Sequence, residues 1–143
     1  MSAGASGFLL VRVGHRRVGL LVEQVLEVIQ LGEVHPVPVM ETAVRGLVAV
    51  HGRMLPLVHL ASLLEGRPTP VGSGNVGVVV NIAGRRVCLE VEDAEVLVQE
   101  PALPVPPGET LPWAVGVARH AETLVPLLDL PALSSRVTEA SAP

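Results

Sequence analysis

The side chains able to carry out chemistry are few and scattered in this chain of 143 residues. No two of its histidines are spaced as metal ligands usually are, and none lies beside the single cysteine, Cys88. The five histidines are at positions 15, 35, 51, 59 and 120. The serines lie mainly in the termini and loops, and no Gly-x-Ser-x-Gly elbow presents a nucleophile. The sequence therefore predicts that the protein is not an enzyme and has no metal and no cofactor.

Two other clusters invite a chemical interpretation. Four carboxylates crowd the segment from Glu90 to Glu95, but an acid/base pair needs a cleft, and a solvated face is the simpler explanation. The glycine-rich stretch from Gly72 to Gly77 lacks the Lys-Ser/Thr of a phosphate-binding loop. We interpret it as part of a linker.

The composition indicates a globular core of branched aliphatic side chains. Hydrophobic residues make up 49% of the chain, with 27 valines and 21 leucines, whereas the only aromatic residues are Phe8 and Trp113. The formal net charge is −4, and all ten basic residues are arginine. Because few rings are present for stacking bases and no basic excess for binding phosphates, we expect no nucleic-acid partner.

The sequence also predicts a cytoplasmic protein with no direct membrane insertion. It has no run of 18 apolar residues, and no basic N-terminal segment leads into an apolar run as in a secretory signal. One cysteine cannot form an internal disulfide, which indicates a reducing compartment.

The chain repeats itself. Gly46–Leu60 aligns with Gly116–Leu130 without a gap at an offset of 70 residues, and Val11–Glu23 aligns with Val80–Glu92 at an offset of 69. This period is too long for a solenoid repeat, so it indicates two copies of one small unit packed together. We expect Gly46 and Gly116 to take equivalent places.

Short aliphatic runs separated by turn residues predict an all-β fold. Three pairs of runs form hairpins, namely Phe8–Val13 with Val18–Val22, Leu47–Val50 with Met54–Val58, and Val76–Ile82 with Val87–Val91. Further strands are expected at Val96–Val98, Trp113–Ala118 and Leu124–Leu128. Leu21–Ile29 also fits helical spacing, and we interpret it as a strand with an irregular turn. About five strands in each half indicate a pair of small closed barrels.

The expected domain occupies residues 8–133, with a first half at 8–66, a linker at 67–75 and a second half at 76–133. Residues 1–7 and 134–143 are small and polar, so we expect flexible ends. Short helices are expected at Leu60–Leu64 and after Leu130. Two proline-rich stretches, His35–Pro38 and Pro101–Pro107, are either ligands for proline-recognising domains or, more simply, rigid crossovers between strands.

The repeat and the Gly46–Leu60 block together resemble the CheW-like family of bacterial chemotaxis adaptors. The family pattern is a glycine, two aliphatics, Asn-Leu-Arg-Gly, and then two aliphatics, a proline, two aliphatics and Asp-Leu. Here it reads Gly-Leu-Val-Ala-Val-His-Gly-Arg-Met-Leu-Pro-Leu-Val-His-Leu. Upstream, the Phe8 hairpin and Val22–Ile29 match the family's opening, and the resemblance spans roughly residues 8–133. It implies two five-stranded SH3-like β-barrels with short helices.

The resemblance also implies partners. They are the cytoplasmic tip of methyl-accepting chemoreceptors and the regulatory domain of a CheA-type histidine kinase, in a non-catalytic adaptor recruited to receptor arrays. The family's receptor-coupling positions fall on Val25, Glu27, Gly46 and His51, and its kinase-contact segment carries Val28. Alternation alone leaves open whether Val25 and Val28 are core residues instead.

Three departures from the family pattern bear on these partners. Ala49 replaces the Asn of the signature, His51 replaces its Arg, and His59 replaces the Asp after the proline strand. We expect Glu27 and His51 to be neighbours, as the family's Glu and Arg are. A histidine is charged only when protonated, so an accessory CheW-like paralogue that binds the receptor without engaging the kinase is the alternative. An oligonucleotide-binding barrel and a small hydrolase are disfavoured by the missing rings and catalytic groups.

Overall fold

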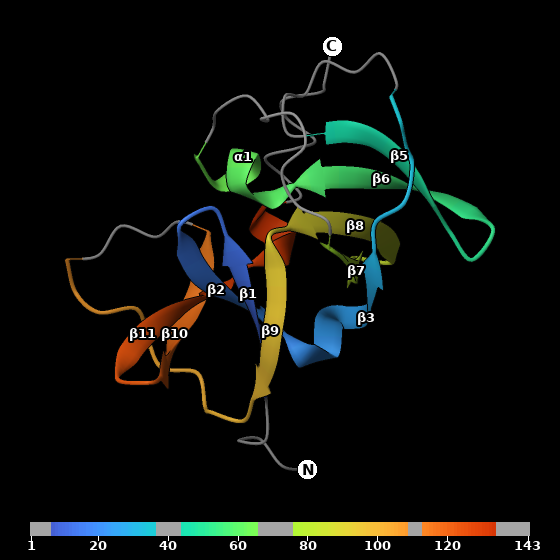
Figure 1. Ribbon diagram of the computed structural model, residues 1–143. Coiled ribbons are helices and arrows are strands. Elements are labelled where there is room, and N and C mark those ends of the chain that lie inside the picture. The colour runs from blue at the N-terminus through green and yellow to red at the C-terminus, as the bar shows by residue number, and fades with distance from the viewer. Residues whose placement is uncertain (1–6, 37–43, 66–75, 109–112, 134–143) are drawn as a thin grey trace.

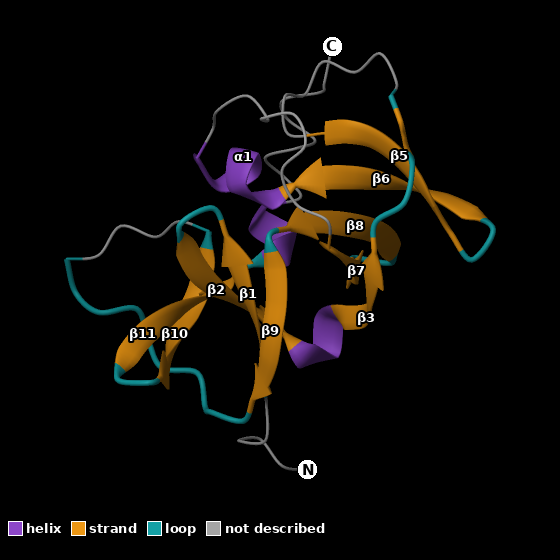
Figure 2. Ribbon diagram, viewed as in Figure 1, coloured by secondary structure: helices purple, strands orange, loops and turns teal. Residues whose placement is uncertain are grey.

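The structure is a computed structural model that describes residues 7–36, 44–65, 76–108 and 113–133. It is built almost entirely from β-strands (Figures 1 and 2). The elements in chain order are β1 (Phe8–Val13), β2 (Arg16–Leu21), the 3₁₀ helix η1 (Val22–Gln24), β3 (Val25–Gln30), β4 (Val34–His35), β5 (Val44–Val50), β6 (Arg53–His59), α1 (Leu60–Glu65), β7 (Val76–Ile82), β8 (Arg85–Val91), β9 (Asp93–Val98), β10 (Ala114–His120) and β11 (Thr123–Leu128). Residues 130–133 are again helical.

The three hairpins and the helices expected from the sequence are confirmed, and β10–β11 is a fourth hairpin. Val22, expected at the end of the second strand, belongs instead to η1. β1–β2, β5–β6, β7–β8 and β10–β11 pair as antiparallel hairpins, each with a two-residue turn. Leu21–Ile29, which also fits helical spacing, is a strand with an irregular turn as interpreted, because η1 forms the turn and β3 forms the strand. The expected linker at 67–75 lies outside the described residues, as do the expected flexible ends except for Gly7.

The strands form two sheets, and each sheet takes strands from both halves of the sequence. The first has the order β10-β11-β2-β1-β9, and the second has the order β3-β7-β8-β6-β5-β4. In Figure 1 the blue β1 and β2 lie beside the yellow β9 and the orange β11, while the light-blue β3 lies beside the olive β7. The first hairpin of each half has therefore joined the later strands of the other half.

Each sheet closes on itself into a barrel, because the chain that leaves one edge strand reaches the other edge. After β3, the short β4 pairs with β5, and after β9, Leu103 forms a bridge with Val117 of β10. We call the barrel of β1, β2 and β9–β11 the first barrel, and the barrel of β3–β8 the second barrel. The two five-stranded barrels predicted for this fold are present, with β4 as the continuation of β3.

A glycine lies at each closure point. Gly46 has a φ of +148°, and a Cβ there would collide with the carbonyl oxygen of His35. A Cβ on Gly116 would lie 2.6 Å from the carbonyl oxygen of Leu103. The two glycines thus occupy equivalent places, as the 70-residue offset predicts, and they let the closing segment cross the bulged strand.

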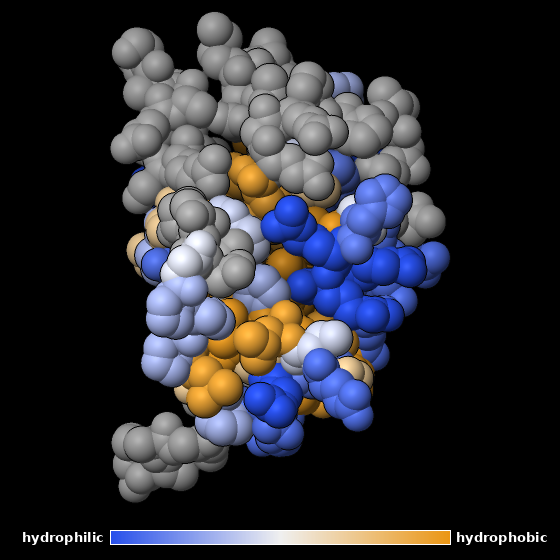
Figure 3. All heavy atoms as spheres, turned by 90° about the vertical axis from the view of Figure 1, so that its left-hand side faces the viewer, coloured by the Kyte–Doolittle hydropathy of each residue, from blue (hydrophilic) through white to orange (hydrophobic). Residues whose placement is uncertain are grey.

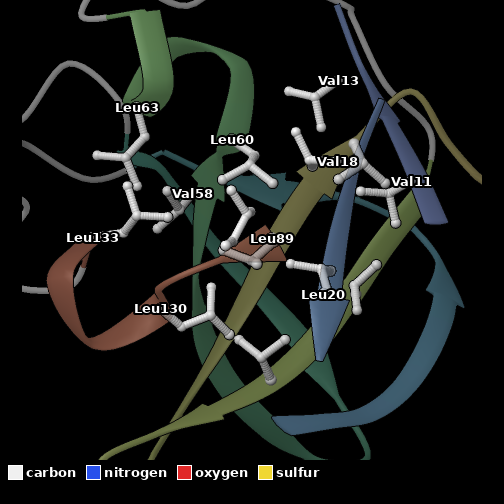
Figure 4. Close-up of a cluster of buried hydrophobic side chains, with 14 of the residues drawn as sticks. Val11, Val13, Val18, Leu20, Val58, Leu60, Leu63, Leu89, Leu130 and Leu133 are labelled. Carbon is white, nitrogen blue, oxygen red and sulfur yellow. The ribbon is translucent and has the colours of Figure 1, made fainter. Parts of the chain in front are cut away.

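Three apolar clusters fill the molecule. Phe8, Leu10, Val98, Ala118, Val125 and Leu127 fill the first barrel, and Val48, Val50, Leu55, Leu57, Val79 and Cys88 fill the second. The largest cluster, which we call the shared core, draws side chains from both barrels, including Leu20 of the first and Val58 and Leu89 of the second (Figure 4). Leu55, Leu57, Val125 and Leu127, which flank the two equivalent prolines of β6 and β11, are all buried. Since Val58 and Leu128 belong to the shared core, both faces of β6 and β11 are buried at the C-terminal ends of these strands.

The repeat extends to the packing of single side chains. Leu57 pairs in parallel with Cys88, and at the offsets of 70 and 69 Leu127 pairs with Gly19. A Cβ on Gly19 would lie 2.6 Å from Phe8, whereas a Cβ on Gly77, the counterpart of Phe8, would lie 2.6 Å from the Cys88 sulfur. The larger side chain thus comes from β1 in the first barrel and from β8 in the second.

Candidate functional site

Glu27 and His51 lie in contact on the surface of the second barrel, which confirms their expected proximity. Nε2 of His51 is 2.8 Å from Oε1 and 3.0 Å from Oε2 of Glu27. Because a carboxylate can only accept, the imidazole N–H is the donor and Nε2 carries the proton. The side chains are 75% exposed for His51 and 38% exposed for Glu27, so the pair is open to a partner.

Local backbone geometry brings these two residues together. His51 and Gly52 form the β5–β6 turn with φ values of +50° and +80°, the type I′ sign pattern that favours strand pairing. Histidine is one of the few residues with a side chain that tolerates positive φ. On β3, a bulge between Val25 and Glu27 shifts the register against β7. The contact between Glu27 and His51 therefore links β3 to the β5–β6 turn of the second barrel.

A surface hollow of about 240 Å³ lies beside the pair. Its lining combines apolar side chains, such as Leu26 and Leu55, with Arg53 and Arg86. Leu26 and Val28 of β3 are both about half exposed. This surface offers apolar contacts, a carboxylate and cationic groups, which suits the binding of a protein segment.

The other predicted site residues occupy different environments. Val25 is partly buried against the shared core, whereas Val28 is 47% exposed. Of these two valines, Val28 is therefore the one whose side chain a partner can contact. Gly46 lies in the closure of the barrel and faces backbone atoms of His35 and Pro36. The structure therefore brings Glu27 and His51 together, whereas Val28 follows Glu27 on β3 without lining the hollow beside the pair, and Gly46 supports the fold.

An ion pair that sequence patterns do not reveal lies inside the second barrel. Nε of Arg45 is 2.7 Å from one oxygen of Glu90, and its Nη2 is 2.9 Å from the other oxygen. Glu90 is 2% exposed, and hydrogen bonding to it raises the pKa of Arg45. Such a bidentate, charge-assisted pair is stronger and geometrically more specific than a hydrogen bond between neutral groups. The solvated face expected for the Glu90–Glu95 segment is therefore wrong for Glu90, whose carboxylate is buried against Arg45.

His59, which replaces the family's aspartate, caps helix α1. Its Nδ1 accepts a hydrogen bond from the Ser62 backbone N–H at 3.3 Å, and the Ser62 hydroxyl lies 2.8 Å from the same nitrogen. Asp129, its counterpart in the second half, accepts from the Ala132 N–H at 3.2 Å. The substitution thus preserves a capping acceptor, and this departure concerns the fold rather than a partner.

Within the described residues, no group of histidine, cysteine and carboxylate side chains is arranged to hold a metal ion. Burial, and secondarily the charge of Glu90, raise the pKa of the Cys88 thiol from 9.0 to about 12. A thiol with this pKa is a packing group at neutral pH. No helix in the described part of the chain is long and apolar enough to span a membrane.

The surface also carries apolar areas away from the Glu27–His51 pair. Figure 3 shows one on the side where β10 and β11 lie in Figure 1, next to a hydrophilic area. Val115 on β10 and Leu124 on β11 are each about half exposed. These positions enlarge the surface available for protein contacts.

Two interlocked small barrels with an exposed polar pair beside apolar side chains define, by fold and site, a β-barrel interaction domain. The chain belongs to the CheW-like domain family, whose model matches residues 7–138. Among solved structures, it is similar to the scaffolding protein TtCheW from Thermoanaerobacter tengcongensis, with a TM-score of 0.79 and 18% sequence identity, over 90% of this chain and 92% of that one. At this identity the similarity establishes the fold. A comparison with curated proteins finds no match.

Proposed function

We propose that this protein is a non-catalytic adaptor that couples methyl-accepting chemoreceptors to a CheA-type histidine kinase. Membership of the CheW-like family supports an adaptor role, and so does the similarity to a protein described as a scaffold. We further propose that it acts in the cytoplasm and is recruited to receptor arrays.

The observation that carries the proposal is the Glu27–His51 contact. The family signature has an arginine at position 51, and the histidine here still reaches both oxygens of the carboxylate. An exposed pair of this kind contributes only about 0–1 kcal/mol to stability. A contact with so little value for folding is better explained as orienting a binding surface, with Val28 as the adjacent apolar contact.

A pull-down with the receptor hairpin and with the kinase regulatory domain tests the proposal. The wild-type protein should bind both partners, and Glu27→Arg should weaken binding with almost no change in melting temperature. Glu100→Arg is a matched control, because Glu100 is an exposed carboxylate next to β9 on the first barrel. Wild-type binding to neither partner would rule out the adaptor role, whereas unaltered binding by Glu27→Arg would show that the pair is not the coupling surface.

The histidine at position 51 also supports a second candidate, an accessory CheW-like protein that binds the receptor without activating the kinase. Arginine carries a permanent positive charge, whereas histidine is charged only when it is protonated. His51 therefore does not offer Glu27 or a binding partner the permanent cation that the family's arginine offers. Kinase activity reconstituted with receptor and this protein separates the two candidates. Strong activation by this protein alone would exclude the accessory role.

A further inference from the structure

An apolar cavity of about 410 Å³ lies at the edge of the shared core. Its walls include Val58 of β6, Leu63 of α1, and Val87 and Leu89 of β8, while Arg85 lies at the start of β8. Arg86 is the one described residue that it shares with the hollow beside the Glu27–His51 pair. The cavity is therefore a separate feature of the molecule.

The internal repeat shows how the corresponding place is filled on the other side of the molecule. At the offsets of 69 and 70, the counterparts of Val87, Leu89 and Val58 are Val18, Leu20 and Leu128. All three counterparts belong to the shared core together with Trp113. Trp113 is only 6% exposed and thus packs in one cluster with the counterparts of residues that line the cavity in the second barrel.

In the first barrel, the guanidinium of Arg16 lies over the ring of Trp113. Cζ of Arg16 lies 5.7 Å from the centroid of the Trp113 ring, within the range of a cation–π contact. The 69-residue offset places Arg85 at the position of Arg16, so the cavity retains the cation. The 70-residue offset aligns Trp113 with Ala43, which has no ring and lies outside the described residues.

We propose that this cavity binds a small bicyclic aromatic molecule of the indole class. Its ring would take the place that Trp113 takes in the first barrel, with its face toward Arg85. The volume lies within the range of small-molecule sites, which are mostly apolar with a few polar groups that fix orientation. Indole is also the aromatic ring that attracts a cation most strongly.

A titration of the full-length protein with indole, followed by methyl NMR, tests this site. We expect saturable shifts at the methyl groups of Val58, Leu63 and Leu89, with a Kd on the order of 0.1–1 mM for so small a ligand. The methyl groups of Leu127, inside the first barrel, should not respond. Absence of saturable shifts at the cavity residues would overturn the proposal.

Three variants locate the binding. Arg85→Ala should weaken indole binding between about 2-fold and 30-fold, the range expected for loss of a cation–π contact. Arg16→Ala removes the equivalent arginine beside Trp113, so it is the matched control and should leave the Kd unchanged. An effect of Arg16→Ala as large as that of Arg85→Ala would overturn the assignment of the ring to this cavity.

Val87→Phe tests the site by filling the cavity with an aromatic side chain of the protein. It should abolish indole binding and leave the thermal unfolding transition cooperative, because the added side chain enters empty space. If Val87→Phe does not fold, Arg85→Ala at an exposed position still decides the question. Unchanged affinity in a folded Val87→Phe protein would refute the site.

Discussion

Replacement of Gly46 by alanine should disrupt the closure of the second barrel. Gly46 has a φ of +148°, a region that residues with a Cβ rarely adopt, at a cost of about 1–3 kcal/mol. The new methyl group would also collide with the His35 carbonyl oxygen and lie 3.1 Å from Cα of Pro36. Because these are backbone atoms, β4 itself must move away from β5.

Substitutions at two other glycines separate the cost of positive φ from the cost of the steric clash. A Cβ on Gly52, which has a φ of +80°, meets no atom within 4 Å, so Gly52→Ala should cost only the conformational term of about 1–2 kcal/mol. Gly32 has free space and no positive φ, so Gly32→Ala should stay within about 0.5 kcal/mol of the wild type. For Gly46→Ala, strain and lost β4–β5 pairing together predict about 3–5 kcal/mol.

Urea unfolding followed by circular dichroism and by Trp113 fluorescence measures the three free energies. The reasoning is refuted if Gly46→Ala is no more destabilising than Gly52→Ala. If the expected order holds, any loss of partner binding in a Gly46 variant follows from the displaced strand. Under the proposed adaptor function, Gly46 would then act on coupling through the fold, and Glu27 and His51 would act through contact.

Three further predictions concern the interior. Leu57→Ala should lower the free energy of unfolding by about 2–5 kcal/mol, whereas Met54→Ala, at an exposed position of the same strand, should change it by less than about 0.5 kcal/mol in urea titrations. Equal effects would contradict a core role for Leu57. Glu90→Ala removes the buried carboxylate of the ion pair with Arg45 and should cost about 3–5 kcal/mol by the same measurement, and a neutral result would show that the pair contributes no stability. Cys88 should resist a thiol reagent at pH 8 until the protein unfolds, since its pKa is raised to about 12. Because the folded state keeps the proton that the unfolded thiol loses above its ordinary pKa of 9.0, this group should lower stability as pH rises from 9.0 toward 12, and a rise in its contribution would contradict the assignment.

The local elements were predictable because they depend on neighbouring residues. Turn residues such as His51-Gly52 and the aliphatic runs around them fix the hairpins without help from distant parts of the chain. The repeat predicted that Leu57 and Leu127 lie in equivalent strands, which the registers against Cys88 and Gly19 confirm.

The partners of the strands were not predictable from one sequence. The apolar residues of β1 and β3 predict strands, but nothing in them tells β1 to pair with β9 or β3 with β7. The burial of Glu90 was missed for the same reason, since its partner Arg45 comes from a strand 45 residues away. The Glu27–His51 contact was predictable only through the family resemblance, which supplied a long-range pair that periodicity lacks.

The exchange of hairpins between the halves sets the order in which the protein can acquire its structure during synthesis. When the first half leaves the ribosome, the β1–β2 hairpin has no β9 or β11 to pair with, and β3 has no β7. The second barrel must wait for β7 and β8, and the first barrel must wait for β9, β10 and β11. The chain therefore folds through contacts between residues far apart in sequence, a topology associated with slow folding. Until then the valine-rich edges of the nascent first half are exposed to other chains, and rapid completion of the second half protects them from aggregation.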